Sequence, residues 1–166
     1  MFTRILVPTD FSAPSDVALE YARVMARQFG AALHVLHVVE DSSLEDGFLP
    51  DALIPSSPES RTARLREALE RLSHRITAED REQLRAKSEV IFGKPSHAII
   101  DYASDNGFDL IVMGTHGREG IAHLLMGSVA ELVVRSATCP VMTLHEGHAR
   151  TPIAVRIAEG LRAAAV

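Results

Sequence analysis

Short apolar runs rich in β-branched residues alternate with segments of helical period along most of this chain. The apolar runs are 5–7, 32–39, 88–92, 109–113 and 141–144. Between them, apolar residues recur three or four positions apart, as on one face of a helix. Strands separated by helical crossovers run parallel and are buried on both faces. We therefore predict an α/β fold with an open five-stranded parallel sheet of order 3-2-1-4-5 and helices on both faces, a Rossmann-like arrangement.

Four helices are predicted between these strands. The first covers 17–29, between Pro14 and Gly30, and the third runs from Pro95 to a stop at Asn106-Gly107. The last helix starts at Ser128. The second helix is strongly charged and carries an apolar stripe made of Leu65, Leu69, Leu72 and Ile76, with its Arg and Glu residues on a solvated face. The Ser/Pro/Asp-rich stretch 40–58 is predicted to be a loop or lid.

The length and charge of the chain exclude several classes of protein. The 166 residues suit one domain, which we place at 1–145, followed by a tail at 146–166 that is either frayed or a short amphipathic helix. The net charge of -5 argues against binding to nucleic acid or to an anionic membrane surface. No apolar run approaches the roughly 20 residues of a membrane span. Cys139 is the single cysteine, which favours a reducing compartment, so we expect a cytoplasmic protein.

A glycine-bearing loop follows the fourth predicted strand and leads to the last helix. It contains Gly114-Thr115-His116-Gly117-Arg118, and Gly127-Ser128-Val129 follows at the helix start. Backbone N–H groups and the dipole of a helix N-terminus can together hold a phosphate. Glycines would allow close approach of the backbone and positive φ angles at Gly114, Gly117 and Gly127. The Ser128 hydroxyl could donate to a phosphate oxygen, and Arg118 could form charge-assisted hydrogen bonds.

In the order 3-2-1-4-5, the carboxyl ends of the first and fourth strands are neighbours. Pro8-Thr9-Asp10 should therefore face the glycine loop across one crevice, with Val38-Val39 as a further wall. Asp10 could accept a hydrogen bond from a ribose or an adenine, or help to hold a divalent cation such as Mg²⁺. Three simpler interpretations stay open. Ser128 and Glu131 match the pattern of a capping box, so Ser128 could simply cap its helix. Arg118 and Glu119 could form an ordinary exposed ion pair, and Asp10 could serve only to form a local turn.

The spacing Gly114-x2-Gly117-x9-Gly127-Ser128 resembles the nucleotide-binding signature of the universal stress proteins. The resemblance extends to the segments 5–12, 36–38, 109–114 and 139–141 in the expected order, and so covers residues 1 to about 145. It implies the five-stranded fold of the adenine nucleotide alpha hydrolase-like class. It also implies a homodimer, or a higher oligomer, formed through the fifth strand Val141–Leu144.

The family resemblance further implies an ATP site, with ADP or AMP as other ligands. Pro8, Asp10 and the backbone of Val38 would line the adenine and ribose pocket, with Thr9 between them. The ribose and phosphates would be flanked by Met113, Gly114, His116 and Gly117, with Arg118 nearby. Gly127, Ser128 and Val129 would hold the phosphate tail. No catalytic residue is predicted, because neither Asp10 nor His116 has a spacing that requires one.

Three functions fit these observations. The first is an ATP-binding regulator of the stress response, in which nucleotide orders the 40–58 loop or changes the dimer. The second is a slow ATPase or phosphotransferase, which would need a metal and a group that positions the attacking water. The third is an interaction module whose pocket is vestigial.

Overall fold

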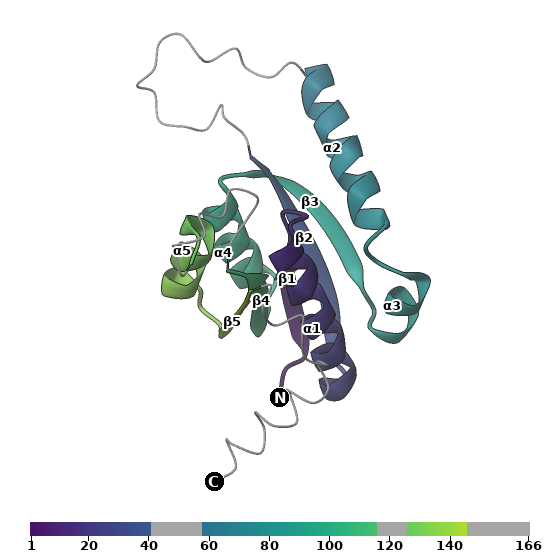
Figure 1. The fold of residues 1–166 in the computed structure, drawn as a ribbon, viewed down its shortest axis with the longest axis vertical. Helices are drawn as coiled ribbons and strands as arrows, with labels where there is room; N and C mark the ends of the chain where they lie inside the picture. The colour runs from purple at the N-terminus through teal and green to yellow at the C-terminus, as the bar shows by residue number, and fades with distance from the viewer. Residues whose placement is uncertain (41–57, 116–125, 146–166) are drawn as a thin grey trace.

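The computed structural model describes residues 1–40, 58–115 and 126–145, which form a five-stranded parallel sheet with helices on both faces (Figure 1). The strand order is β3-β2-β1-β4-β5, which confirms the predicted fold class and order. The elements are β1 Arg4–Pro8, α1 Ala13–Phe29, β2 Ala32–Glu40, α2 Pro58–Ser73, α3 Ala78–Gln83, β3 Lys87–Gly93, α4 Pro95–Asp105, β4 Leu110–Gly114, α5 Ser128–Ser136 and β5 Val141–Leu144.

Alternate residues of the strands enter two separate cores, one on each face of the sheet. Ile5 and Val7 of β1 pack with α1 and with Leu72 of α2, whereas Leu6 packs on the opposite face with α4 and α5. β4 divides in the same way, since Val112 joins the first core and Ile111 joins the second. This period-2 division is what a sheet covered on both faces requires.

The charged region after β2 differs from the single helix predicted there. Two helices are present, because α2 ends at Ser73 and α3 starts after the cap residue Thr77, whose side chain accepts from the Asp80 N–H at 3.0 Å. The predicted apolar stripe is also wrong in part. Leu72 is buried, but Leu69 is 47% exposed, because the face of α2 that meets the sheet is centred between Ala68 and Leu72.

Other helix ends follow the sequence signals. Pro95 occupies the first turn of α4, Asn106 caps its C-terminus, and Gly107 follows with φ +62°. Gly30 ends α1 in the left-handed conformation with φ +68°. Across the described ranges, no helix is both long enough and apolar enough to cross a membrane. The predicted lid at 40–58, apart from its first and last residues, and the tail at 146–166 lie outside the described residues.

Candidate functional site

The direction of the strand order reverses between β1 and β4, which are direct neighbours. Ile5 pairs with Leu110 and Leu6 with Ile111, so both strands end at the same edge of the sheet. In open parallel sheets this reversal opens a crevice beyond the carboxyl ends of the strands, where ligands bind. β1 ends at Pro8 and β4 at Gly114, so Thr9-Asp10 and Thr115 leave the sheet at this edge.

The segment after β1 is a tight turn built on its own side chains. The hydroxyl of Thr9 accepts from the Phe11 N–H at 3.0 Å and lies 3.0 Å from the hydroxyl of Ser15. One carboxylate oxygen of Asp10, Oδ1, accepts from the Ser12 N–H at 3.1 Å and from the Ser12 hydroxyl at 2.5 Å. The turn chemistry considered for Asp10 is therefore present. A carboxylate oxygen accepts more than one hydrogen bond, so this turn is compatible with a second role.

The end of β2 forms the adjoining wall. Pro8 pairs with Leu36, and the Thr9 N–H donates to the Leu36 carbonyl oxygen at 2.8 Å. His37 Nδ1 lies 2.7 Å from the Thr9 carbonyl oxygen, which ties β2 to the turn. Val38 follows directly and is half-buried, with its side chain against the core shared with α4 and α5. The prediction that a ligand meets the backbone of Val38 is compatible with this packing of its side chain.

Gly114 lacks the positive φ that we predicted, and the structure gives a packing reason for a glycine at this position. Its φ is not positive, since among the described glycines only Gly30 and Gly107 have positive φ. A Cβ at Gly114 would lie 2.9 Å from both the carbonyl carbon and the Cβ of Pro14. The glycine is therefore required by the close approach of α1 to β4, next to the crevice. Met113 is 5% exposed and packs in the core, so only its backbone borders the site.

The chain returns to the end of β4 at the start of α5. The Thr115 N–H donates to the Leu144 carbonyl at 2.7 Å, and the Thr115 carbonyl accepts from the Gly127 N–H at 2.6 Å. The N-terminus of α5 therefore lies beside the carboxyl end of β4. The segment between them, with the predicted site residues His116, Gly117 and Arg118, lies outside the described residues.

The start of α5 corrects two expectations. The N-cap is Gly127, with φ -73° and ψ 155°, so this glycine does not adopt a positive φ. Ser128 is the first helical residue, and no side-chain hydrogen bond caps the helix, so the capping box considered for Ser128 and Glu131 is absent. A capping hydroxyl must stand one residue before the helix, and here that position is occupied by glycine. The first N–H groups of any α-helix lack a hydrogen-bond acceptor within the helix. In α5 the cap residue is glycine, so no cap side chain supplies an acceptor to them.

Three residues of the site region were missed by sequence reasoning. Phe11 has φ +66°, and its ring packs against His37 on one element and against the guanidinium of Arg71 on another. The distance from Arg71 Cζ to the ring centroid is 4.0 Å. The regular spacing of charges on α2 is typical of a solvated face and carries no signal of this contact.

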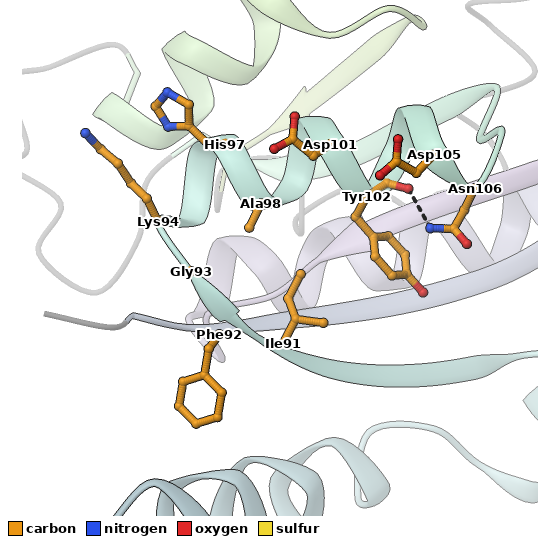
Figure 2. Close-up of a pocket in the computed structure, with 10 residues that line it drawn as sticks. All are labelled: Ile91, Phe92, Gly93, Lys94, His97, Ala98, Asp101, Tyr102, Asp105 and Asn106. Atoms are coloured by element: carbon orange, nitrogen blue, oxygen red, sulfur yellow. Dashed lines mark hydrogen bonds between the residues drawn. The ribbon is translucent and has the colours of Figure 1, made fainter. Parts of the chain in front are cut away.

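A separate hollow of about 370 Å³ lies between the edge strand β3 and α4, and Figure 2 shows its lining. Tyr102 and Asp101 line it along α4, and Ile91 and Gly93 border it from β3. It includes none of the predicted site residues, and β2 separates β3 from β1. Its position at the sheet edge, away from the reversal of strand order, gives no reason to move the candidate site there. The described ranges contain no cluster of three or more His, Cys, Asp or Glu side chains suited to a metal ion.

The crevice at the strand reversal and the fold together define a doubly wound α/β protein. A family model of the universal stress proteins matches residues 1–145, and the chain belongs to this family. It is 31% identical to the universal stress protein YxiE of Bacillus subtilis, over 86% of this chain and 98% of that protein.

Solved structures agree with this assignment. The universal stress protein UspA from Lactobacillus plantarum superposes with a TM-score of 0.73 at 32% identity, covering 86% of this chain and 97% of that one. A universal stress protein solved in complex with cAMP superposes with a TM-score of 0.55 at 26% identity, covering 87% of this chain and 98% of that one.

Proposed function

We propose that this protein binds an adenine nucleotide, with ATP as the leading ligand, in the crevice at the carboxyl ends of β1, β2 and β4. The observation that carries the proposal is the hydrogen bond from the Gly127 N–H to the Thr115 carbonyl. It holds the N-terminus of α5 at the carboxyl end of β4, and β4 pairs with β1, the strand that leads into the turn containing Asp10. A helix N-terminus at this position favours the negative charge of a phosphate.

The residues present fit such a ligand. The cap residue Gly127 has no side chain, so a phosphate oxygen can approach the N–H groups of Ser128 and Val129. The Ser128 hydroxyl adds a donor at the same position. Across the crevice, the Asp10 carboxylate can accept from a ribose hydroxyl, and the Val38 backbone can bond the adenine edge. Pro8, Thr9, Met113 and Gly114 complete the walls, and His116, Gly117 and Arg118 belong to the proposed site by the family signature.

The family relationship supports the same ligand class, because a related universal stress protein has been solved with cAMP. We assign ATP rather than cAMP on the glycine signature, with Asp10 as the residue that would help to hold Mg²⁺. Within this proposal the protein is a cytoplasmic homodimer that signals nucleotide state during stress, and it is a binder rather than an enzyme.

Equilibrium calorimetry with ATP, ADP, AMP and cAMP, each with and without Mg²⁺, tests the proposal. We expect binding below millimolar concentration for at least ATP, and its loss in Gly127→Val. The backbone of Gly127 is in a conformation open to any residue, so this loss would report blocked access to the helix N–H groups. Gly117→Val should act in the same direction. The matched control is Val134→Thr, a change at a 44% exposed position on α5 that should leave affinity unchanged.

Two results would contradict this assignment. If none of the four nucleotides binds below millimolar concentration, the protein is not a nucleotide sensor. If binding survives unchanged in Gly127→Val and Gly117→Val, the ligand lies elsewhere. Phosphate release followed over hours, and absent from Gly127→Val, would instead indicate the slow ATPase.

A further inference from the structure

Phe11, in the turn after β1, is held in a backbone conformation that bulky residues rarely adopt. Its φ of +66° lies in the left-handed region that favours glycine. The hydrogen bond from the Ser12 N–H to the Asp10 carboxylate depends on this conformation, because the backbone dihedrals of Phe11 set where the Ser12 N–H points relative to Asp10. Such a conformation persists only where the surroundings fix it.

The ring of Phe11 is fixed by groups from two other elements. Arg71 Cζ lies 4.0 Å and Arg75 Cζ 4.8 Å from the ring centroid. The imidazole of His37 lies 4.3 Å from the ring, tilted by 35°. Phe11 is only 9% exposed, so these contacts enclose it. Guanidinium groups bind aromatic faces through their charge and their flat shape, which makes this enclosure attractive as well as steric.

Arg71 and Arg75 are anchored differently. Arg75 Nε donates to Asp16 Oδ1 of α1 at 2.8 Å, and the Arg75 carbonyl accepts from the Arg23 side chain. Arg75, in the turn that follows α2, therefore also joins this turn to α1. Within the described ranges, the side-chain contact of Arg71 is the one with Phe11, so its substitution tests the ring contact.

We propose that Arg71 is a positioning residue for the nucleotide site, acting through Phe11. By holding the ring, with Arg75 and His37, it keeps Phe11 in the left-handed conformation and so fixes the Asp10 carboxylate at the crevice. The inference rests on the proposed nucleotide-binding function and deepens it, because it makes the docking of α2 a determinant of affinity. A nucleotide that requires the ordered turn would in return stabilise α2 on the sheet.

A purely structural role for Arg71 is the competing explanation, and α2 supplies a matched control. Arg61, near the start of the same helix, places its Cζ 4.5 Å from the ring of Phe92 on β3. Arg61→Gln removes an arginine–aromatic contact of α2, as Arg71→Gln does, but its contact is with Phe92 of β3 and the turn at Phe11 stays intact. Any effect of weaker α2 docking alone should therefore occur in both variants.

Two measurements on the full-length protein test the proposal. The first is ATP affinity by calorimetry, where Arg71→Gln should raise Kd roughly 3- to 10-fold and Arg61→Gln should change it less than about 2-fold. The second is amide hydrogen exchange of Ser12 without nucleotide. This N–H donates to Asp10, so its exchange should accelerate in Arg71→Gln and not in Arg61→Gln.

A double-mutant cycle identifies the path. Phe11→Gly removes the ring and accepts the left-handed backbone without strain, so Arg71→Gln added to it should cause no further loss of affinity. Equal affinity of Arg71→Gln and the parent protein would overturn the proposal, as would equal losses in Arg71→Gln and Arg61→Gln. If the parent protein binds no nucleotide, the proposed function fails and Arg71 has no site to position. Exchange at Ser12 would then still show whether Arg71 holds the turn.

Discussion

The Gly127 N–H donates to the Thr115 carbonyl oxygen at 2.6 Å, so the start of α5 and the end of β4 are joined directly. Thr115 is itself held by β5, since its own N–H donates to the Leu144 carbonyl at 2.7 Å. Three elements of the sheet edge thus converge on one residue. Backbone hydrogen bonds thus hold the candidate phosphate-binding helix terminus at the end of β4, while Ala130 and Val133 pack the helix into the second core.

Substitution of Gly114 should cost stability, because the glycine makes room for α1. In Gly114→Ala the new Cβ would lie 2.9 Å from two atoms of Pro14 and 3.0 Å from the Ser15 N. We expect the free energy of unfolding to fall by about 1–3 kcal/mol, the usual cost of overpacking. Urea denaturation measures this. Gly93→Ala, whose Cβ would meet only the Ala98 Cβ at 3.2 Å, should cost less, and equal stability of Gly114→Ala and the parent would refute the packing role.

Much of this architecture was predictable from the sequence. Runs such as 110–113 are apolar on both faces, so a parallel sheet covered on both sides was the natural solution, and the strand order followed from crossover rules. Gly114 was recognised as special, but a sequence cannot tell a glycine that approaches a ligand from one that approaches a neighbouring helix. The same limit applies to Ser128, since the pattern Ser-x-x-Glu also occurs one residue inside a helix.

The contacts of α2 were beyond sequence reasoning for a different reason. Arg71 lies on a strongly charged helix and Arg75 in the turn just after it, the usual pattern of a solvated surface. That they bind an aromatic ring depends on Phe11, sixty residues earlier, and on its positive φ. A turn pattern such as Asp10-Phe11-Ser12 gave no indication that its central residue is left-handed, because Phe is among the residues least expected there.

Acid should weaken the protein through Asp80, which joins α3 to α1. Burial would raise the pKa of Asp80, but hydrogen bonds from Arg23 and Thr77 outweigh burial and hold the pKa below its usual range. Because its pKa is lower in the folded protein, the Asp80 carboxylate stabilises the fold at pH values above the pKa of an Asp in the unfolded chain, about 4. This contribution is lost as the pH falls through the lower pKa of Asp80 in the folded protein. The carboxylate is 2% exposed, and its oxygens accept from Arg23 Nε at 3.1 Å.

Asp80→Asn should therefore destabilise the protein by about 3 kcal/mol at pH 7, near the lower bound for a broken buried pair because Glu20 still faces Arg23. Denaturation at pH 7 and at pH 3 checks both statements. The difference in the free energy of unfolding between Asp80→Asn and the parent protein should become smaller at pH 3, because the Asp80 carboxylate of the parent begins to protonate there. A difference that stays constant across this range would mean that the charge of Asp80 is not what stabilises the fold.

Tyr102, beside the hollow in Figure 2, should titrate unusually late. Burial, together with the hydrogen bond of its hydroxyl to Glu89 Oε2 at 2.7 Å and the charge of that carboxylate, raises the pKa of Tyr102 to about 12. Because this pKa is raised above its usual value near 10, the protonated Tyr102 hydroxyl contributes to the stability of the fold. The contribution is complete below pH 10 and is lost between about pH 10 and 12. Ultraviolet absorbance during alkaline titration should show this late step. It should be absent from Tyr102→Phe and move to lower pH in Glu89→Gln; an unchanged step in Glu89→Gln would exclude the carboxylate as a cause.

The proposed homodimer should depend on backbone groups of β5, the last strand at one edge of the sheet. The Pro140 and Leu144 carbonyls bond to β4, so by the alternation of a strand the N–H and C=O groups of Val141 and Thr143 point to the open edge. Thr143→Pro removes one outward donor without touching the β4 ladder, and a charge at Thr143→Lys or Val141→Lys opposes pairing of two such edges. Mass measurement in solution should show at least two chains for the parent protein. The control Thr143→Val keeps the backbone N–H and should also show at least two chains, whereas Thr143→Pro should shift to the monomer. A monomeric parent protein at working concentration would refute the dimer, and a dimeric Thr143→Pro would place the interface away from this edge.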